Sequence, residues 1–467
     1  MKTTKREWMP LYSYLDRTAI TTHLSDMAAQ GWMLEKIGGW SWRYRRAEPK
    51  KLRFAVTFFP AASQFDAVPS ERLETYRDYC AAAGWVLAAE SAQVQIFCTE
   101  DESAVPIETD PAVELGSIRK SAKKGFIGSY WALLTLSLLQ ILFQCYRIWT
   151  DPVDTLSSTA SLAAVLNWLP LDVLILAELT RYYRWQRKAQ TAADAGSPLP
   201  DLRSMRWLNI LVMVWSCFIV LWLLTSYMSS RGMFLLTAGM LLYMSLMILL
   251  ANGAKDVLKR LKAPRWVNIA VTFGIIIVLT LGGTAGMTAL IFRNSGWLEG
   301  HPPAETYEYQ GWTWSVYHDD IPLRIEDLVE TDYDQWSTEA RVDTSFLMTH
   351  GTYTQRPRMD TPGQPDLEYE IVTIKAGLLY DLCKKDFISW AERHNKELPQ
   401  EYRDEYRPVN AAPWEADEVY RLYHSGEPSN QFLVCWPDRM AEVNFDWDWA
   451  VTEGMMSTAA KALKGGD

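Results

Sequence analysis

The strongest constraint on this chain is a block of five long apolar runs between Phe126 and Phe292, separated by short polar loops. Each run holds about 19 to 26 residues, enough for a helix that crosses a hydrocarbon layer roughly 30 Å thick. Backbone amides find no water in that layer, so a spanning segment must satisfy them internally as a helix. The block therefore predicts an integral membrane protein. The expected spans are residues 126–146, 160–179, 207–228, 233–251 and 267–292.

The loops between these runs differ in positive charge, and this difference predicts the orientation of the chain. Fifteen Lys and Arg lie on the side of the N-terminus, and three lie on the opposite side. Because positive loops are retained in the cytoplasm, the N-terminus is expected to be cytoplasmic and the C-terminus extracytoplasmic. The first residues lack the apolar core of a secretory signal, which agrees with that orientation. From residue 294 onward, 33 Asp and Glu against 15 Lys and Arg make the outward segment acidic.

Residues 1–100 are expected to form an α+β domain from two similar β-α-β-β units, a duplication. In each unit a helix ends at a Gly-Trp pair, at 31–32 and 84–85, and two strand-like runs follow. Asp16 and Ser70 are placed to cap the two helices. Together the units predict a compact domain with its helices on one face of an antiparallel sheet. The expected first strands lie near residues 10–15 and 53–59.

One set of residues in this segment carries a family resemblance. The set consists of Leu24, Met27, Ala28, Ala29, Gly31, Trp32 and Leu34, then an aromatic run and Pro49-Lys50-Lys51-Leu52-Arg53-Phe54. The stretch of roughly residues 5–100 is similar to the bacterial "domain of unknown function 2812" family. The resemblance implies a bacterial multi-pass membrane protein with a cytosolic head and a variable tail, often encoded beside PadR-type transcription regulators. It implies no known activity and no catalytic residues.

A basic and aromatic cluster lies in the first unit, and three interpretations of it stay open. Its members are Trp40, Trp42, Arg43, Arg45, Arg46, Lys50, Lys51 and Arg53. Stacking rings beside cations are typical of single-stranded nucleic-acid binding. However, the first hundred residues hold 13 basic and 11 acidic groups, so nucleic acid is not expected as a partner. A solvated face or contact with anionic headgroups is favoured, with the Trp rings in the core. A concave pocket for a small molecule is the third interpretation.

Only the second expected span carries charged residues, Asp172 and Glu178. An ionisable group in a span costs about 2.5–3.5 kcal/mol at its centre, so each is a candidate functional residue. Glu178 lies near the cytoplasmic end, where Arg181 is the expected ion-pair partner. Asp172 has two interpretations: a hydrogen bond to Gln140 or Gln144 of the first span, or a part in a polar path or packing switch.

The segments that flank the membrane block complete the domain organisation. Residues 101–125 are expected to be an acidic linker followed by a basic juxtamembrane segment. Residues 293–467 are long enough to bury a core and predict an extracytoplasmic α+β domain. Helices are expected at 378–394 and 450–463. Strands are expected at 306–316, 367–374, 419–423, 431–436 and 440–445.

Motifs for chemistry are sparse in every segment. The tail cysteines Cys383 and Cys435 would lie on the oxidising side, which allows a disulfide, although two buried thiols fit equally well. His318-Asp319-Asp320 lacks metal-ligand spacing and predicts a solvated turn. We find no phosphate loop or nucleophile elbow, and expect no cofactor, no metal and no catalytic site.

Two folded domains on opposite sides of a helix bundle favour a sensor or regulatory protein. Its expected partners are the lipid bilayer and other proteins in the membrane or cytosol. An accessory subunit of a transporter or envelope-assembly complex is the alternative, with Asp172 as its best support. An enzyme acting at the outer face lacks any candidate nucleophile.

The orientation has a direct test. A reporter that is active only in the cytoplasm, fused after Asp467, is expected to be inactive, while the same reporter fused before Met1 is active. Reporter activity in intact cells measures both, and an active C-terminal fusion would contradict the predicted topology.

Overall fold

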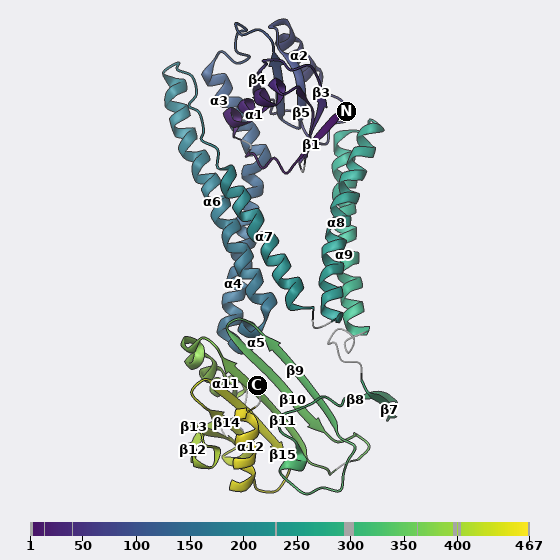
Figure 1. The fold of residues 1–467 in the computed structure, drawn as a ribbon, viewed down its shortest axis with the longest axis vertical. Coiled ribbons are helices and arrows are strands. Elements are labelled where there is room, and N and C mark those ends of the chain that lie inside the picture. The colour runs from purple at the N-terminus through teal and green to yellow at the C-terminus, as the bar shows by residue number, and fades with distance from the viewer. Residues whose placement is uncertain are drawn as a thin grey trace. The chain divides into compact units, whose positions relative to one another are not determined.

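The computed structural model describes residues 3–13, 15–39, 41–228, 231–293, 303–361, 363–395, 399 and 403–465 (Figure 1). The chain divides into two compact units, each built from segments that are distant in sequence. The first unit comprises Met1–Leu139, Asn167–Val220 and Ala238–Leu290. The second comprises Gln140–Leu166, Leu221–Thr237 and Ile291–Asp467.

Within the described residues, five helices are long and apolar enough to cross a membrane, which confirms the predicted multi-pass architecture. Large apolar side chains such as Leu139, Leu221 and Leu281 are exposed along them, as expected of surfaces that contact lipid. These helices are α4 (Gly128–Thr150), α6 (Thr159–Asp194), α7 (Arg206–Ser226), α8 (Arg231–Arg260) and α9 (Arg265–Arg293).

The segment before the first span is not the free linker that its composition predicts. Asp110 caps α3 (Pro111–Ala122) by accepting from the amide of Ala112 at 2.8 Å, and a proline stands at the first helical position. A π-helical turn, Lys123–Ile127, then leads from α3 directly into α4. The preceding residues also pack on the domain, since Trp85 Nε1 donates to the carbonyl of Val105 at 2.8 Å.

The N-terminal domain contains two separate three-stranded antiparallel sheets, with strand orders β1-β3-β2 and β4-β6-β5. The expected single sheet is therefore wrong, because edge strands β2 and β5 pair only within their own sheets. The first strand is β1 at residues 4–8 and not near 10–15. The strands are β1 (Thr4–Trp8), β2 (Trp32–Ile37), β3 (Ser41–Arg46), β4 (Arg53–Phe58), β5 (Val86–Ser91) and β6 (Val94–Thr99).

The two domain helices pack against opposite faces of the second sheet, which also differs from the expectation. On β6, Ile96 and Cys98 join the core that contains α1 (Arg17–Ala29), whereas Phe97 faces α2 (Glu71–Ala82). Ser70 caps α2 as predicted, accepting from the amide of Leu73 at 3.3 Å. Both helices end at a glycine with positive φ, +81° at Gly31 and +84° at Gly84, so both predicted helix ends are confirmed.

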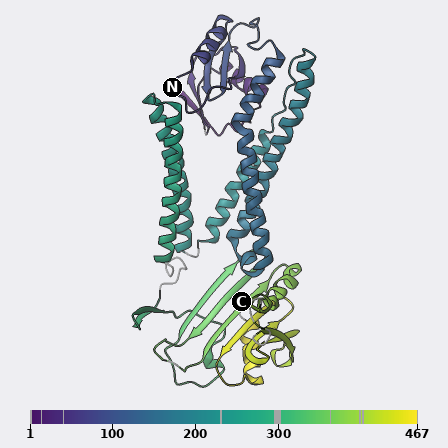
Figure 2. The ribbon, with the colours of Figure 1, turned by 180° about the vertical axis from the view of Figure 1, so that it is seen from behind.

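The second unit is built on a seven-stranded antiparallel sheet, order β12-β13-β14-β15-β11-β10-β9, with helices on both faces (Figure 2). Residues of α12 (Glu453–Gly465) pack on one face, and α5 (Pro152–Ser157) and α11 (Tyr380–His394) pack on the other. The sheet strands are β9 (Ser337–Thr344), β10 (Met348–Arg356), β11 (Asp366–Ile374), β12 (Asp404–Val409), β13 (Glu418–His424), β14 (Glu427–Cys435) and β15 (Arg439–Asp446). The sequence missed β9, β10 and β12. The expected strand at 306–316 is a hairpin of β7 (Glu305–Tyr309) and β8 (Trp312–Val316).

A polar cluster lies inside this otherwise apolar face of the sheet. His350 contacts Asp154 of α5 at 3.0 Å and Glu370 at 2.7 Å, one carboxylate at each ring nitrogen. Glu370 stands directly opposite Glu442 in the β11–β15 ladder. Burial lowers the pKa of His350, but the hydrogen bonds to Asp154 and Glu370 outweigh it and raise the pKa to about 9. Burial, and then the charge of Glu370, raise the pKa of Glu442.

Both shifts make the folded tail bind protons more tightly than the unfolded chain, so stability is expected to fall as pH rises. The contribution of His350 is fully present below its unfolded pKa of about 6.5 and is lost through about pH 9. Thermal unfolding of the purified chain should show a loss of up to about 3 kcal/mol between neutral pH and pH 9 to 10. His350→Gln should flatten this slope. His424→Gln, at an exposed histidine beside Asp404, is the control, and an equal effect of both variants would contradict the assignment.

Candidate functional site

The centre of the first unit is a buried charge cluster around Arg181 of α6, which we call the junction. Nη1 of Arg181 donates to Oδ1 of Asp16 at 2.9 Å, and Nη2 donates to Oε2 of Glu178 at 2.7 Å. Asp16 is fully buried, and Glu178 is 2% exposed. The ion pair expected between Glu178 and Arg181 is therefore present. The guanidinium additionally binds a second carboxylate, from the N-terminal domain.

The junction explains why Asp16 is not the helix cap that the sequence predicts. Asp16 precedes α1, yet its side chain makes no capping hydrogen bond. Its carboxylate instead accepts from Arg181, from Ser204 Oγ at 2.7 Å and from the amide of Ser13 at 2.9 Å. Ser13 Oγ also donates to Glu178 at 3.0 Å. The hydrogen bond between the Asp16 carboxylate and a guanidinium is stronger than a capping bond to backbone amides, because both of its partners are charged.

Three further hydrogen bonds fix the N-terminal domain to membrane helices. On α7, Asn209 donates to the carbonyl of Leu11 at 3.2 Å, and Arg206 donates to the hydroxyl of Tyr12 at 3.0 Å. On α9, the fully buried Asn268 donates to the carbonyl of Phe65 at 3.2 Å. Together with the junction, these bonds tie one soluble domain to α6, α7 and α9.

The extension of α6 beyond the membrane strengthens this attachment. The segment after residue 179 is expected to be a loop, but α6 continues to Asp194. Tyr182, Trp185 and Ala189 of this extension are buried in the same core as α1 and both sheets. A helix long and apolar enough to cross a membrane is thus also a structural element of the N-terminal domain.

Within the span, Asp172 is half-buried and accepts a hydrogen bond from Ser137 Oγ of α4 at 2.5 Å. Among the described residues its partner is Ser137, and neither Gln140 nor Gln144 bonds to it. Ser137 is 1% exposed, so the bond joins the first two spans in a buried place. Ser137 is one of several polar residues in that span, so its sequence position gives no specific signal for this partner.

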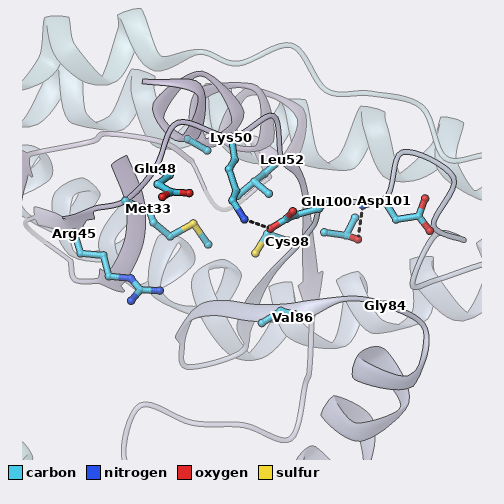
Figure 3. Close-up of a pocket in the computed structure, with 13 residues that line it drawn as sticks. Met33, Arg45, Glu48, Lys50, Leu52, Gly84, Val86, Cys98, Glu100 and Asp101 are labelled. Atoms are coloured by element: carbon cyan, nitrogen blue, oxygen red, sulfur yellow. Dashed lines mark hydrogen bonds and ion pairs between the residues drawn. The ribbon is translucent and has the colours of Figure 1, made fainter. Parts of the chain in front are cut away.

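A cavity of about 580 Å³ opens in the N-terminal domain between residues of β2, β3, β5, β6 and the segment before β4 (Figure 3). Its volume is in the range of small-molecule sites in proteins. Its apolar wall consists of Ala28, Met33, Leu52, Val86 and Cys98. Its charged rim consists of Arg45, Glu48, Lys50, Glu100 and Asp101. Burial raises the pKa of the Cys98 thiol, which makes it an apolar wall group and not a nucleophile.

The predicted basic and aromatic cluster is divided by the fold. Trp42 is buried in the core, as favoured, while Trp40 lies outside the described residues. Arg43 pairs with Glu35 at 2.9 Å, Lys50 with Glu100 at 2.6 Å and Lys51 with Glu102 at 2.5 Å. Arg46 lies over the ring of Trp32. Arg53 donates to the carbonyl of Glu102 at 2.7 Å. Among the described members of the cluster, Arg45 and Lys50 line the cavity.

The tail cysteines are two buried free thiols, so the allowed disulfide is absent. Burial raises the pKa of Cys383 to about 12 and of Cys435 to about 11, and both side chains lie in one apolar core. Asp319, of the predicted turn at 318–320, accepts from the amide of Ala340 at 2.9 Å. Within the described ranges, no group of His, Cys, Asp and Glu has a geometry for a metal ion.

These features define a class, a multi-pass membrane protein with an N-terminal domain anchored on its own helices. Residues 18–129 match the family described as "Protein of unknown function (DUF2812)". The match runs from α1 to the beginning of α4 and contains every residue that lines the cavity, whereas Asp16, Glu178 and Arg181 lie outside it. No curated protein and no solved structure matches the chain.

The junction is expected to dominate the stability of the first unit. Arg181→Gln leaves two buried carboxylates without their cation, and removal of one partner of a buried pair costs about 3–5 kcal/mol. Thermal unfolding of the full chain in detergent should therefore begin at a clearly lower temperature. Arg184→Gln, at an exposed position of the same helix, should leave it unchanged.

A second variant separates charge from packing. Asp16→Asn, Glu178→Gln and Arg181→Gln combined leave no unpaired charge, so much of the lost stability should return. If the triple variant is no more stable than Arg181→Gln alone, the account based on unpaired charges is wrong.

Proposed function

We propose that this protein is a membrane-spanning sensor or regulatory protein that links an outward-facing domain to a cytosolic domain. The observation that carries the proposal is the junction. Asp16 of the soluble domain and Glu178 of the membrane helix share one guanidinium, and all three side chains are largely excluded from water.

The energetics of the junction favour transmission over simple anchoring. Buried charges are costly unless they are paired, so a shift of α6 that separates Arg181 from Asp16 must be accompanied by a shift of α1. The bonds from Asn209 and Asn268 add the same constraint for α7 and α9. A soluble domain without a role in transmission would need none of these bonds to the membrane helices.

The proposal places the duplicated β-α-β-β domain in the cytoplasm of a bacterial cell and the acidic domain outside. The support is the charge of the loops, fifteen cations against three. A cytosolic protein is then the expected partner of the N-terminal domain. The family resemblance makes a PadR-type regulator the first candidate.

An accessory subunit of a transporter or envelope-assembly complex is the second candidate function. The buried bond between Asp172 and Ser137 favours it, because a carboxylate inside a span is expensive to retain. This bond, however, satisfies the carboxylate locally, and it joins only two helices. It supports a packing role at least as well as a conduit.

Capture of partners in intact cells tests the proposal. A photo-crosslinking residue at Tyr79, which is 73% exposed on α2, is placed in the full chain and the captured proteins are identified by mass spectrometry. Arg181→Lys keeps one positive charge but loses the two-sided bridge, so the yield of a captured cytosolic regulator should change several-fold. Arg184→Lys is the matched control and should not change it.

The identity of the captured protein discriminates between the two functions. A transcription regulator or signalling protein whose yield responds to Arg181→Lys supports the sensor. Transporter subunits captured equally in all variants support the accessory role. Capture of no protein at all would contradict both.

A further inference from the structure

We infer that the cavity of the N-terminal domain is a binding site for a small organic carboxylate with an apolar body. The inference deepens the proposed function and rests on it for its biological role, although the binding itself can be measured alone. It assigns the cavity as the place where the cytosolic domain receives a chemical signal.

The wall of the cavity selects an apolar body. Met33, Leu52 and Val86 present aliphatic or thioether groups, and the buried thiol of Cys98 is uncharged at neutral pH. Figure 3 shows the side chains of Met33 and Cys98 directed into the space between the two sheets. Burial of apolar ligand surface here is favourable by about 25 cal/mol per Å².

Among the two cations and three carboxylates of the rim, Arg45 is the group placed to bind an anionic head group. Lys50 binds Glu100 at 2.6 Å, so these two charges cancel, and the charge of Glu48 acts on Lys50 more weakly. Asp101 accepts from the amide and the hydroxyl of Ser103 at 2.7 and 2.6 Å. Arg45 forms no ion pair within the described chain, and Figure 3 shows its guanidinium at one side of the rim, apart from the ion pair of Lys50 and Glu100. The fork of an arginine binds a carboxylate through two parallel hydrogen bonds.

The loop that closes the cavity is bonded to the end of α1. The amide of Lys50 donates to the carbonyl of Ala28 at 3.2 Å, and the amide of Ala47 donates to the carbonyl of Gly31 at 3.0 Å. A Cβ on Gly31 would approach the carbonyl oxygen of Ala47 to 2.8 Å, so the contact is too close for any side chain. A ligand that draws Arg45 and this loop together therefore acts directly on the C-terminal turn of α1.

The same helix reaches the junction at its other end. The chain of α1 is 13 residues long, about 20 Å, with Asp16 before its first turn and Ala28 in the cavity wall. A bound carboxylate and the ion pair with Arg181 thus act on the two ends of one rigid element. Through this connection, a ligand bound in the cavity can influence the membrane helices.

The test uses the full chain in lipid nanodiscs and three probes with one apolar body. These are 4-phenylbutyrate, its neutral amide and 4-phenylbutylamine, and isothermal titration calorimetry measures their affinities against empty nanodiscs. The carboxylate should bind about tenfold or more tighter than the amide and the amine, because a charge-assisted hydrogen bond is lost in both.

Variants locate the site. Arg45→Gln should abolish the preference for the carboxylate, while Arg43→Gln, on the same strand but paired with Glu35 outside the cavity, should keep it. Val86→Trp fills the space from an exposed position and should prevent binding of all three probes. Equal affinity for the three probes, unchanged binding in Arg45→Gln and Val86→Trp, or no binding of the carboxylate at millimolar concentration would each overturn the inference.

Failure of the site and failure of the proposed function are separable. If the carboxylate binds as expected but Arg45→Gln and Arg181→Lys leave the captured partners unchanged, the site stands and the sensor does not. If partner capture responds to Arg181→Lys while the cavity binds no carboxylate, the sensor stands and this ligand class does not.

Discussion

The first unit of this protein depends on one guanidinium with two carboxylates. Arg181 neutralises Asp16 and Glu178, which are both withdrawn from water, and it also donates to the carbonyl of Arg203 at 2.9 Å. Without the cation, two buried carboxylates would lack a charged partner, which is costly. The position of α1 relative to α6, the entry of the chain at Ser13 and the course of the segment after α6 all follow from satisfying this cluster.

The N-terminal domain consequently shares its core with the helices of the first unit and is not joined to them by a flexible linker alone. Its core contains residues of α3 and of the α6 extension as well as its own sheets, and α3 leads into α4 without a break. The cavity belongs to this same body. Because α1 contacts the cavity at Ala28 and the junction at Asp16, rigid packing can carry a local change from one to the other. The domain, α3 and the extension of α6 therefore form one packed body.

Sequence reasoning succeeded where the signal is local and failed where two distant segments compete. Apolar runs predicted the five helices, and the Gly-Trp pairs predicted both helix ends, since a left-handed residue after a helix strongly favours glycine. Asp16 was assigned to a cap because its partner stands 165 residues away. Strands β9 and β10 were missed because polar residues such as His350 interrupt their alternation of apolar and polar side chains. His350 is buried there because Asp154 of α5 pairs with it, and the sequence gives no sign of that contact. The cavity was anticipated as a possibility of the fold, but Met33, Val86 and Cys98 carry no recognisable pattern.

By itself, the amino-acid sequence determined that the chain crosses a membrane with five helices and carries folded segments before and after them. Run length, helix stops and loop charge are properties of contiguous residues, so no tertiary knowledge is required to evaluate them. Only the tertiary structure decided which polar groups meet. Arg181 pairs with Asp16 as well as with Glu178, and Asp172 accepts a hydrogen bond from Ser137. The N-terminal strands form two separate sheets, and a cavity lies in that domain. The physical reason is that hydrogen bonds and ion pairs act over a few ångströms, whereas the residues that form them lie tens to hundreds of positions apart.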